Sequence, residues 1–199
     1  MKKKLLLTLW FSLLLLAIGY LFWQNEFKYS LPTPVPQNYK AIAMGSKIDL
    51  GACCPYDQRP IFIHFFNPDC PCSRFNVPHV KDLIKTYGNQ IDFKIVVLNK
   101  EQRFTIAEIQ DKFDAKIPVY FEESIAEKCG VFSTPQAVLL DPSHNLYYRG
   151  NYNKTRYCTD AKTNYAQMAI DAYLSEKHKP SFDAFAMKAY GCSLPKCTK

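Results

Sequence analysis

The stretch PIFIHFFNPDCPCSRF, residues 60–75, joins two patterns that belong to different kinds of secondary structure. Residues 60–66 form a short run of β-branched and aromatic side chains, which predicts a strand buried on both faces. Behind it come Cys70, Pro71 and Cys72, followed by apolar residues at a helical spacing. Proline is favoured at the first position of a helix, where its missing N–H is not needed. We therefore expect a buried strand, a loop and a helix that begins at Pro71.

Outward from this stretch, strand-like and helix-like segments alternate. The helix behind the cysteines is predicted to end at Gly88, and Pro78 is expected to kink or restart it. Further strands are predicted at 91–99, 117–123, 134–141 and 146–153, and further helices at 105–113, 124–130 and 162–177. The alternation favours parallel pairing through right-handed crossovers, followed by a hairpin and a covering helix. The sequence thus predicts a three-layer α/β domain.

The cysteines behind the first strand have the features of a reactive pair. Pro71 makes Cys70 the expected N-cap residue, so its thiol faces unpaired N–H groups and the positive end of the helix dipole. We expect a lowered pKa there and assign Cys70 as the nucleophile. Cys72 is one candidate for the resolving thiol. Because residues 70–73 also read as Cys-x-x-Ser, a distant cysteine such as Cys192 or Cys197 is the other candidate.

The N-terminal residues 1–24 resemble a membrane anchor. The apolar run at 5–23 spans about 28 Å as a helix, close to the hydrocarbon thickness of a bilayer. Three lysines at 2–4 favour a cytoplasmic N-terminus. An uncut anchor is favoured over a cleaved signal peptide, since residues 17–19 make a poor cleavage site. We expect a single-pass protein of the bacterial inner membrane with its domain in the periplasm.

Charge and cysteine content fit that location. The chain carries a formal net charge of +7, and the three N-terminal lysines account for nearly half of it. The remaining basic residues are scattered among acids, so a nucleic-acid partner is not expected. Exported proteins hold disulfides, and an even cysteine count is compatible with complete pairing. The eight cysteines are Cys53, Cys54, Cys70, Cys72, Cys129, Cys158, Cys192 and Cys197.

Composition divides the rest of the chain into three parts. Residues 25–44 contain Pro32, Pro34 and Pro36, which predict an extended spacer that lifts the domain off the membrane. The folded domain is expected at 45–178. Residues 179–199 form a cysteine-containing C-terminal tail.

Two motifs resemble a known family. FFNPDCPCSRF (65–75) aligns with the strand, loop and helix of thioredoxin-like thiol–disulfide oxidoreductases, and STPQAVLLD (133–141) resembles the loop before their penultimate strands. The resemblance covers roughly residues 45–177. It is closest to membrane-tethered periplasmic proteins of the TlpA/redoxin kind, and within them to a Cys-Pro-Cys subgroup with a further cysteine after the hairpin, here Cys158.

The resemblance implies a thioredoxin-like fold, with a central mixed sheet flanked by helices, and a set of site residues. Cys70 would be the attacking cysteine, Pro135 would be a cis-proline packed against its sulfur, and the backbone of Thr134 would pair with a bound peptide. His64 falls where thioredoxins keep a buried acid that accepts a proton from the resolving cysteine. Ser73, which occupies the family's second cysteine position, departs from the pattern.

These residues predict an extracytoplasmic thiol–disulfide oxidoreductase that needs no cofactor. Its partners would be protein thiols or disulfides, together with a redox partner protein. The alternative is a thioredoxin-like metallochaperone that binds Cu(I), since thiolates are soft ligands suited to that ion. Cys70, Cys72 and His79 would be the metal ligands in that case.

Overall fold

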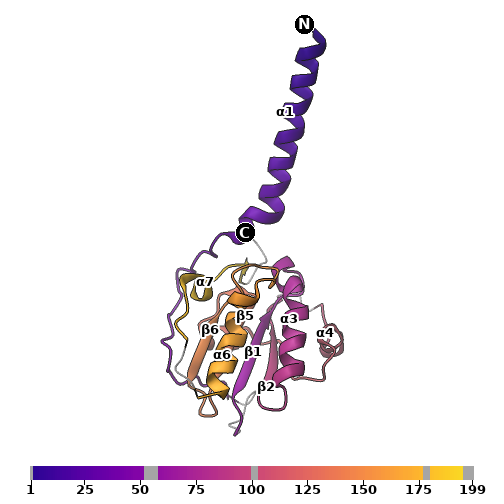
Figure 1. The fold of residues 1–199 in the computed structure, drawn as a ribbon. Coiled ribbons are helices and arrows are strands. Elements are labelled where there is room, and N and C mark those ends of the chain that lie inside the picture. The colour runs from indigo at the N-terminus through magenta and orange to yellow at the C-terminus, as the bar shows by residue number, and fades with distance from the viewer. Residues whose placement is uncertain (1, 52–57, 100–102, 177–179, 195–199) are drawn as a thin grey trace.

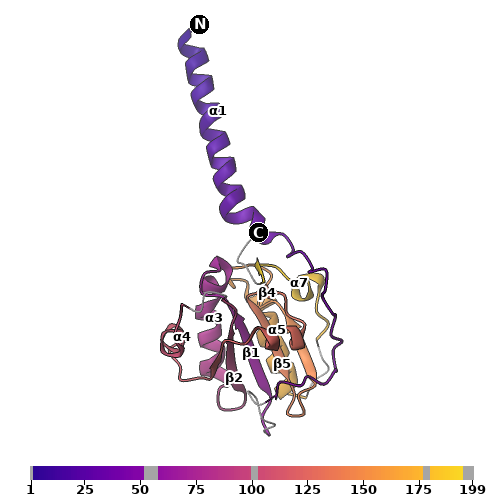
Figure 2. The same ribbon diagram turned by 180° about the vertical axis from the view of Figure 1, so that it is seen from behind.

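The computed structural model describes residues 2–51, 58–99, 103–176 and 180–194. An apolar helix, α1 (Lys2–Phe22), continues through a π-helical turn, η1 (Trp23–Phe27), into α2 (Lys28–Ser30). It projects from the α/β domain as a separate rod in both views (Figures 1 and 2). By its length and composition it is a candidate membrane span or a signal sequence.

A five-stranded mixed sheet forms the centre of the domain, in the order β3-β2-β1-β5-β6. Its strands are β1 (Ile61–Phe66), β2 (Asp92–Val97), β3 (Val119–Tyr120), β5 (Gln136–Leu140) and β6 (Leu146–Gly150). β1 lies in the middle, parallel to β2 and antiparallel to β5, and β5 and β6 form the hairpin. This topology confirms the predicted thioredoxin-like fold.

Helices cover both faces of the sheet. One face carries α3 (Pro71–Tyr87) and α6 (Tyr165–Leu174), with α4 (Ile106–Phe113) beside α3 (Figure 1), and α5 (Glu123–Cys129) covers the other (Figure 2). Side chains of β1 alternate between the two cores: Phe62 and Phe66 join the first, and Phe65 joins the second. Because both faces are covered, all six residues of β1 are buried, and this explains why five of the six, all but His64, are apolar.

The helix after the cysteines does not restart at Pro78, and the predicted kink there stays a prediction. The residue lies inside α3, which is assigned as one helix from Pro71 to Tyr87. Proline removes the hydrogen bond to the carbonyl of Arg74, one turn earlier. Both residues are exposed, so water is available to that carbonyl and the helix need not end.

The proline-rich segment also differs from the expected spacer. The helix continues to Ser30, two residues before the first proline, and Leu31 is extended, as a residue before proline prefers. From there the chain runs along the outside of the domain, at the left edge of Figure 1 and, after the half-turn, at the right edge of Figure 2. Backbone and side-chain hydrogen bonds fix it there, from Thr33 N to Ala189 O at 2.8 Å and from Tyr39 OH to Gly130 O at 3.0 Å.

The C-terminal segment packs onto the domain rather than hanging free. It contains α7 (Ala184–Met187) and a two-residue strand, β7 (Cys192–Ser193), which pairs antiparallel with β4 (Ser133–Thr134) in a second small sheet. The Asn151 amide donates to the carbonyls of Phe185 and Lys188 at 2.6 and 2.8 Å. These bonds place β7 at the end of the domain where α3 begins.

Candidate active site

The loop between β1 and α3 positions the first cysteine. Cys70 is the N-cap of α3, with extended backbone angles, and Pro71 is the first helical residue, as the sequence predicts. Asn67 shapes the loop: its side-chain oxygen accepts from the Asp69 N–H at 2.9 Å, and its own N–H lies 3.4 Å from the Ser73 hydroxyl oxygen. Ser73 therefore contacts the loop that holds Cys70.

A cis peptide bond lies directly opposite this cysteine. The Thr134–Pro135 bond is cis, and the carbonyl oxygen of Thr134 lies 3.5 Å from the Cys70 sulfur. Thr134 is fully buried. The two predicted motifs, whose first residues are 65 and 133, thus meet at one point through the pairing of β1 with β5.

Cys70 is bonded to Cys192 in a disulfide that joins the start of α3 to β7. The two Cα atoms are 6.1 Å apart and 122 residues apart in sequence. The sequence interpretation included Cys192 among the distant candidates for the partner of Cys70. It did not include the strand that carries this cysteine.

Cys72 lies at the second helical position, beside the bond but outside it. Cys70, Cys72 and Cys192 form one buried cluster, against which the ring of Tyr29 packs. The exposed fractions of the three cysteines are 0%, 0% and 1%. A resolving attack by Cys72 on the Cys70 sulfur would therefore take place inside this cluster.

The other cysteines fall in different places. Cys129 is buried in the core around α5. The thiol of Cys158 lies 3.0 Å from the side-chain oxygen of Asn76, one turn after Cys72 on α3. Burial, with the nearby charge of Cys72, raises the pKa of Cys158 to about 12, so it is a thiol at neutral pH. Cys53, Cys54 and Cys197 lie outside the described residues.

A buried arginine lies close to the cysteine cluster. The Arg156 guanidinium donates to the Glu26 carboxylate at 2.8 Å and stands over the rings of Tyr29, Phe75 and Tyr157. Burial opposes its charge, but its bond with Tyr157 and the charges of Cys72 and Glu26 raise its pKa on balance. This cation favours negative charge on the sulfurs nearby.

His64 occupies the middle of β1, and its ring is fully buried. Its Nδ1 lies 2.7 Å from the Tyr152 hydroxyl, and within the described part of the chain its Nε2 has no hydrogen-bond partner. Burial, with the nearby His79, lowers the pKa of His64 to about 3. The imidazole is therefore neutral at neutral pH, and the proton transfer implied by the family resemblance stays a prediction.

The alternative metal site is not assembled. Among the residues that the structure describes, no group of three or more His, Cys, Asp or Glu side chains is arranged to hold a metal ion. Cys70 is consumed by the disulfide, and the ring of His79 stands against Tyr152, 5.9 Å between ring centres. The set Cys70, Cys72 and His79 therefore does not form in this state of the protein.

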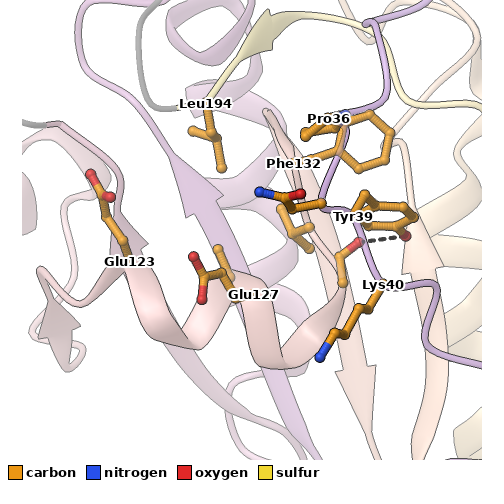
Figure 3. Close-up of a pocket in the computed structure, with 11 residues that line it drawn as sticks. Pro36, Tyr39, Lys40, Glu123, Glu127, Phe132 and Leu194 are labelled. Atoms are coloured by element: carbon orange, nitrogen blue, oxygen red, sulfur yellow. Dashed lines mark hydrogen bonds between the residues drawn. The ribbon is translucent and has the colours of Figure 1, made fainter.

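Two surface pockets flank the tail, and they differ in their relation to the cysteines. One, of about 480 Å³, lies between the 36–40 segment, α5 and Leu194 (Figure 3), and none of the five cysteines that the structure describes lines it. The other, of about 450 Å³, is lined by Tyr29, Arg156 and Tyr190, the residues around the cysteine cluster. The second pocket is the one adjacent to the chemistry.

Sequence reasoning missed the ring of Tyr29, the guanidinium of Arg156 and the strand β7. Each contacts the cysteine cluster through tertiary packing between segments far apart in the sequence, which local sequence patterns do not predict. The available signal for β7 was Gly191 directly before Cys192, because a glycine beside a cysteine permits close backbone approach.

Comparisons with known proteins agree with this fold. Residues 43–196 match the family model described as "Domain of unknown function (DUF6436)". A search of curated proteins found no match. Similar solved structures are a hypothetical protein from Sinorhizobium meliloti 1021 (18% identity, 79% of this chain and 96% of that one, TM-score 0.63) and an uncharacterized conserved protein from Geobacillus kaustophilus (14%, 81% and 97%, 0.59).

A further similar structure is the thioredoxin domain of a thiol-disulfide oxidoreductase from Bacteroides vulgatus, at 14% identity, 60% of this chain, 96% of that one and a TM-score of 0.45. At such identities the likeness concerns the fold alone.

Proposed function

The chain belongs to the DUF6436 family, and from its site we propose that it is a thiol–disulfide oxidoreductase with Cys70 as the nucleophile. The observation that carries the proposal is the Cys70–Cys192 disulfide at a helix N-terminus, facing a cis-proline. Unpaired N–H groups at the start of α3 stabilise the Cys70 thiolate when that bond is reduced. A stabilised thiolate both attacks disulfides and leaves them readily.

The exchange conserves electrons between two dithiol pairs. A thiolate of a reduced partner protein attacks one sulfur of the disulfide, and the other sulfur leaves as a thiolate. The partner's second thiolate then attacks the partner's first sulfur in this mixed disulfide, and the sulfur of this protein leaves as a thiolate. The partner is thereby oxidised, and Cys70 and Cys192 are reduced. The same steps in reverse reduce a partner disulfide and re-form the Cys70–Cys192 bond. Cys192 or Cys72 supplies the resolving thiolate, and Pro135 and the Thr134 backbone position the sulfur of Cys70.

We propose that this exchange occurs outside the cytoplasm. The apolar helix at Lys2–Ser30 would hold the protein in the bacterial inner membrane, with the lysines at its start on the cytoplasmic side. The domain would then face the periplasm, where disulfides persist. Its substrates would be protein thiols or disulfides.

Redox titration tests the proposal. The full-length protein is equilibrated in detergent with glutathione buffers of graded potential, free thiols are trapped by alkylation, and mass spectrometry maps each cysteine. We expect Cys70 and Cys192 to change state together at one midpoint potential. A bond that stays oxidised across the range down to strongly reducing buffers would mark a structural cross-link and overturn the proposal.

A further inference from the structure

We propose that β7 is a tethered substrate: the C-terminal strand fills, with its own Cys192, the position that a cysteine of an external polypeptide takes during exchange. This inference rests on the proposed function and adds to it a regulatory contact. An external polypeptide would have to displace β7 before it could bond to Cys70.

The first support is that Cys192 occupies the place beside Cys70 that the cysteine of a substrate protein must take. Any protein that exchanges with Cys70 passes through a disulfide between Cys70 and one of its own cysteines. In this structure that place is taken by Cys192, whose backbone pairs antiparallel with Thr134 while Ser193 pairs with Ser133. The edge at Ser133–Thr134 therefore binds an extended chain next to the reactive sulfur. In pairing of this kind the main-chain hydrogen bonds give affinity, and the side chains beside them give specificity.

The second support is access. The sulfurs of Cys70, Cys72 and Cys192 are all buried while β7 is docked. Cys70 cannot move away from the cluster, since it is held between β1 and α3, the centre of the fold. β7 has two residues and can leave without disturbing the main sheet. An external thiol or disulfide thus reaches Cys70 once β7 has been displaced.

The third support is the division of the tail at Gly191. Before it, Tyr190 is held firmly, because its hydroxyl donates to the carbonyls of Asn153 and Thr155 at 3.0 and 3.1 Å. After it, β7 is held to the β4 segment by the strand pairing and by the bond from Leu194 N to Phe132 O at 3.1 Å. The disulfide of Cys192 adds to these backbone bonds. Gly191 separates the part of the tail fixed at Tyr190 from the part that pairs with β4, and it marks the hinge.

Gly191 also controls how closely β7 approaches. Its φ is +110°, in the region that favours glycine, and a Cβ there would collide with the carbonyl oxygen of Thr134. The substitution Gly191→Ala is therefore expected to push β7 off the edge while leaving Cys192 in the chain. Gly45 is a matched control, since its φ is +84° and a Cβ there would meet nothing within 4 Å.

The test measures how well β7 competes with a free copy of itself. The full-length protein, in a Cys72→Ser background that prevents internal resolution, is oxidised at Cys70–Cys192 and titrated with the thiol peptide AYGCSL, the sequence of residues 189–194. The peptide thiolate attacks the Cys70 sulfur, a Cys70–peptide disulfide forms, and Cys192 leaves as a thiolate. One disulfide replaces another, so no oxidant is needed. Mass spectrometry gives the fraction of protein with peptide on Cys70.

The effective concentration of the tethered strand is the peptide concentration at which the Cys70–peptide and Cys70–Cys192 disulfides are equally populated. We expect a value of the order of millimolar for the parent protein, as for other short tethers. Gly191→Ala should lower it about tenfold, a difference of about 1.4 kcal/mol in docking, and Gly45→Ala should leave it within about twofold of the parent value. A peptide of the same composition in scrambled order should require a concentration about tenfold higher than AYGCSL.

Two results would overturn the inference, and they are distinguishable. If Gly191→Ala and Gly45→Ala exchange at the same concentration, and the scrambled peptide matches AYGCSL, then β7 carries a thiol without occupying a binding edge, and the proposed function stands. If no peptide bonds to Cys70 at any concentration, the disulfide is inert and the proposed function fails as well.

Discussion

The start of α3 and the strand β7 supply the two halves of one disulfide, yet they are built in opposite ways. Cys70 follows a fully buried strand and begins a helix of 17 residues, so its position is fixed by the centre of the fold. Cys192 lies in a strand of two residues beyond the last long helix. The comparison teaches that one half of the site is a fixed nucleophile and the other is a removable partner.

The largest expected effect comes from the fixed half. Cys70→Ser should reduce the rate of exchange with a fluorescent glutathione disulfide about a hundredfold or more, because it removes the attacking sulfur. Cys129→Ala, a change in the core around α5, is the control and should retain most of the rate. Comparable rates for the Cys70→Ser variant and the parent protein would place the nucleophile elsewhere.

Removal of Cys192, in the removable half of the site, should chiefly lower the free energy of unfolding. Cys192→Ser opens the covalent link between residues 122 positions apart, and links that close long loops typically contribute about 2 to 4 kcal/mol to the free energy of unfolding. Urea denaturation in oxidising buffer measures the loss. In reducing buffer the variant and the parent should agree, and a difference that persists there would trace to packing rather than to the bond.

Acid should act on the fixed half of the molecule, through His64 in the middle of β1. Burial lowers its folded-state pKa to about 3, so below pH 6.5 the unfolded chain binds a proton that the folded chain excludes. The free energy of unfolding should therefore fall as the pH falls from 7 to 5, by about 2 kcal/mol for this residue. Urea denaturation at both pH values, with His64→Gln as the comparison, measures it. An equal fall in the variant would remove His64 as the cause.

The smallest effect is expected where the helical rod meets the site. Glu26→Gln removes the charge that pairs with Arg156, and because the Glu26 side chain is 40% exposed, the loss should be about 0.5 kcal/mol in unfolding free energy. Glu127→Gln, at an exposed position on α5, is the control. A loss above about 2 kcal/mol, the range of buried pairs, would show that this contact belongs to the core of the site.

The two regions also differ in how far the sequence predicts them. β1 and α3 follow from local physics: an apolar run of strand length, proline at the first helical position and Gly88 after the last turn. The cis peptide at Pro135 was implied by family resemblance, since a Thr-Pro pair alone has no such meaning. The pairing of Cys70 with Cys192 was one alternative among several, because connectivity depends on tertiary contacts.

The unpredicted features share a physical cause. β7 is too short to show a periodicity, and its pairing depends on how α7 is tied to Asn151. Tyr29 and Arg156 reach the cysteines from segments that the sequence places in a linker and a loop. The prolines after residue 31 predict a non-helical chain, but its path along the domain is set by hydrogen bonds from Thr33 and Tyr39 to residues far along the chain.

The distance between the bonded cysteines along the chain sets an order of events during synthesis. At about 5 to 20 residues per second, Cys70 emerges from the ribosome roughly 6 to 24 seconds before Cys192. All strands of the main sheet precede Cys192 and can form within that interval. The bond therefore forms only after every strand of the main sheet has been synthesised, and a chain that ends before residue 192 cannot make it. The disulfide thus distinguishes chains that extend through Cys192 from shorter ones.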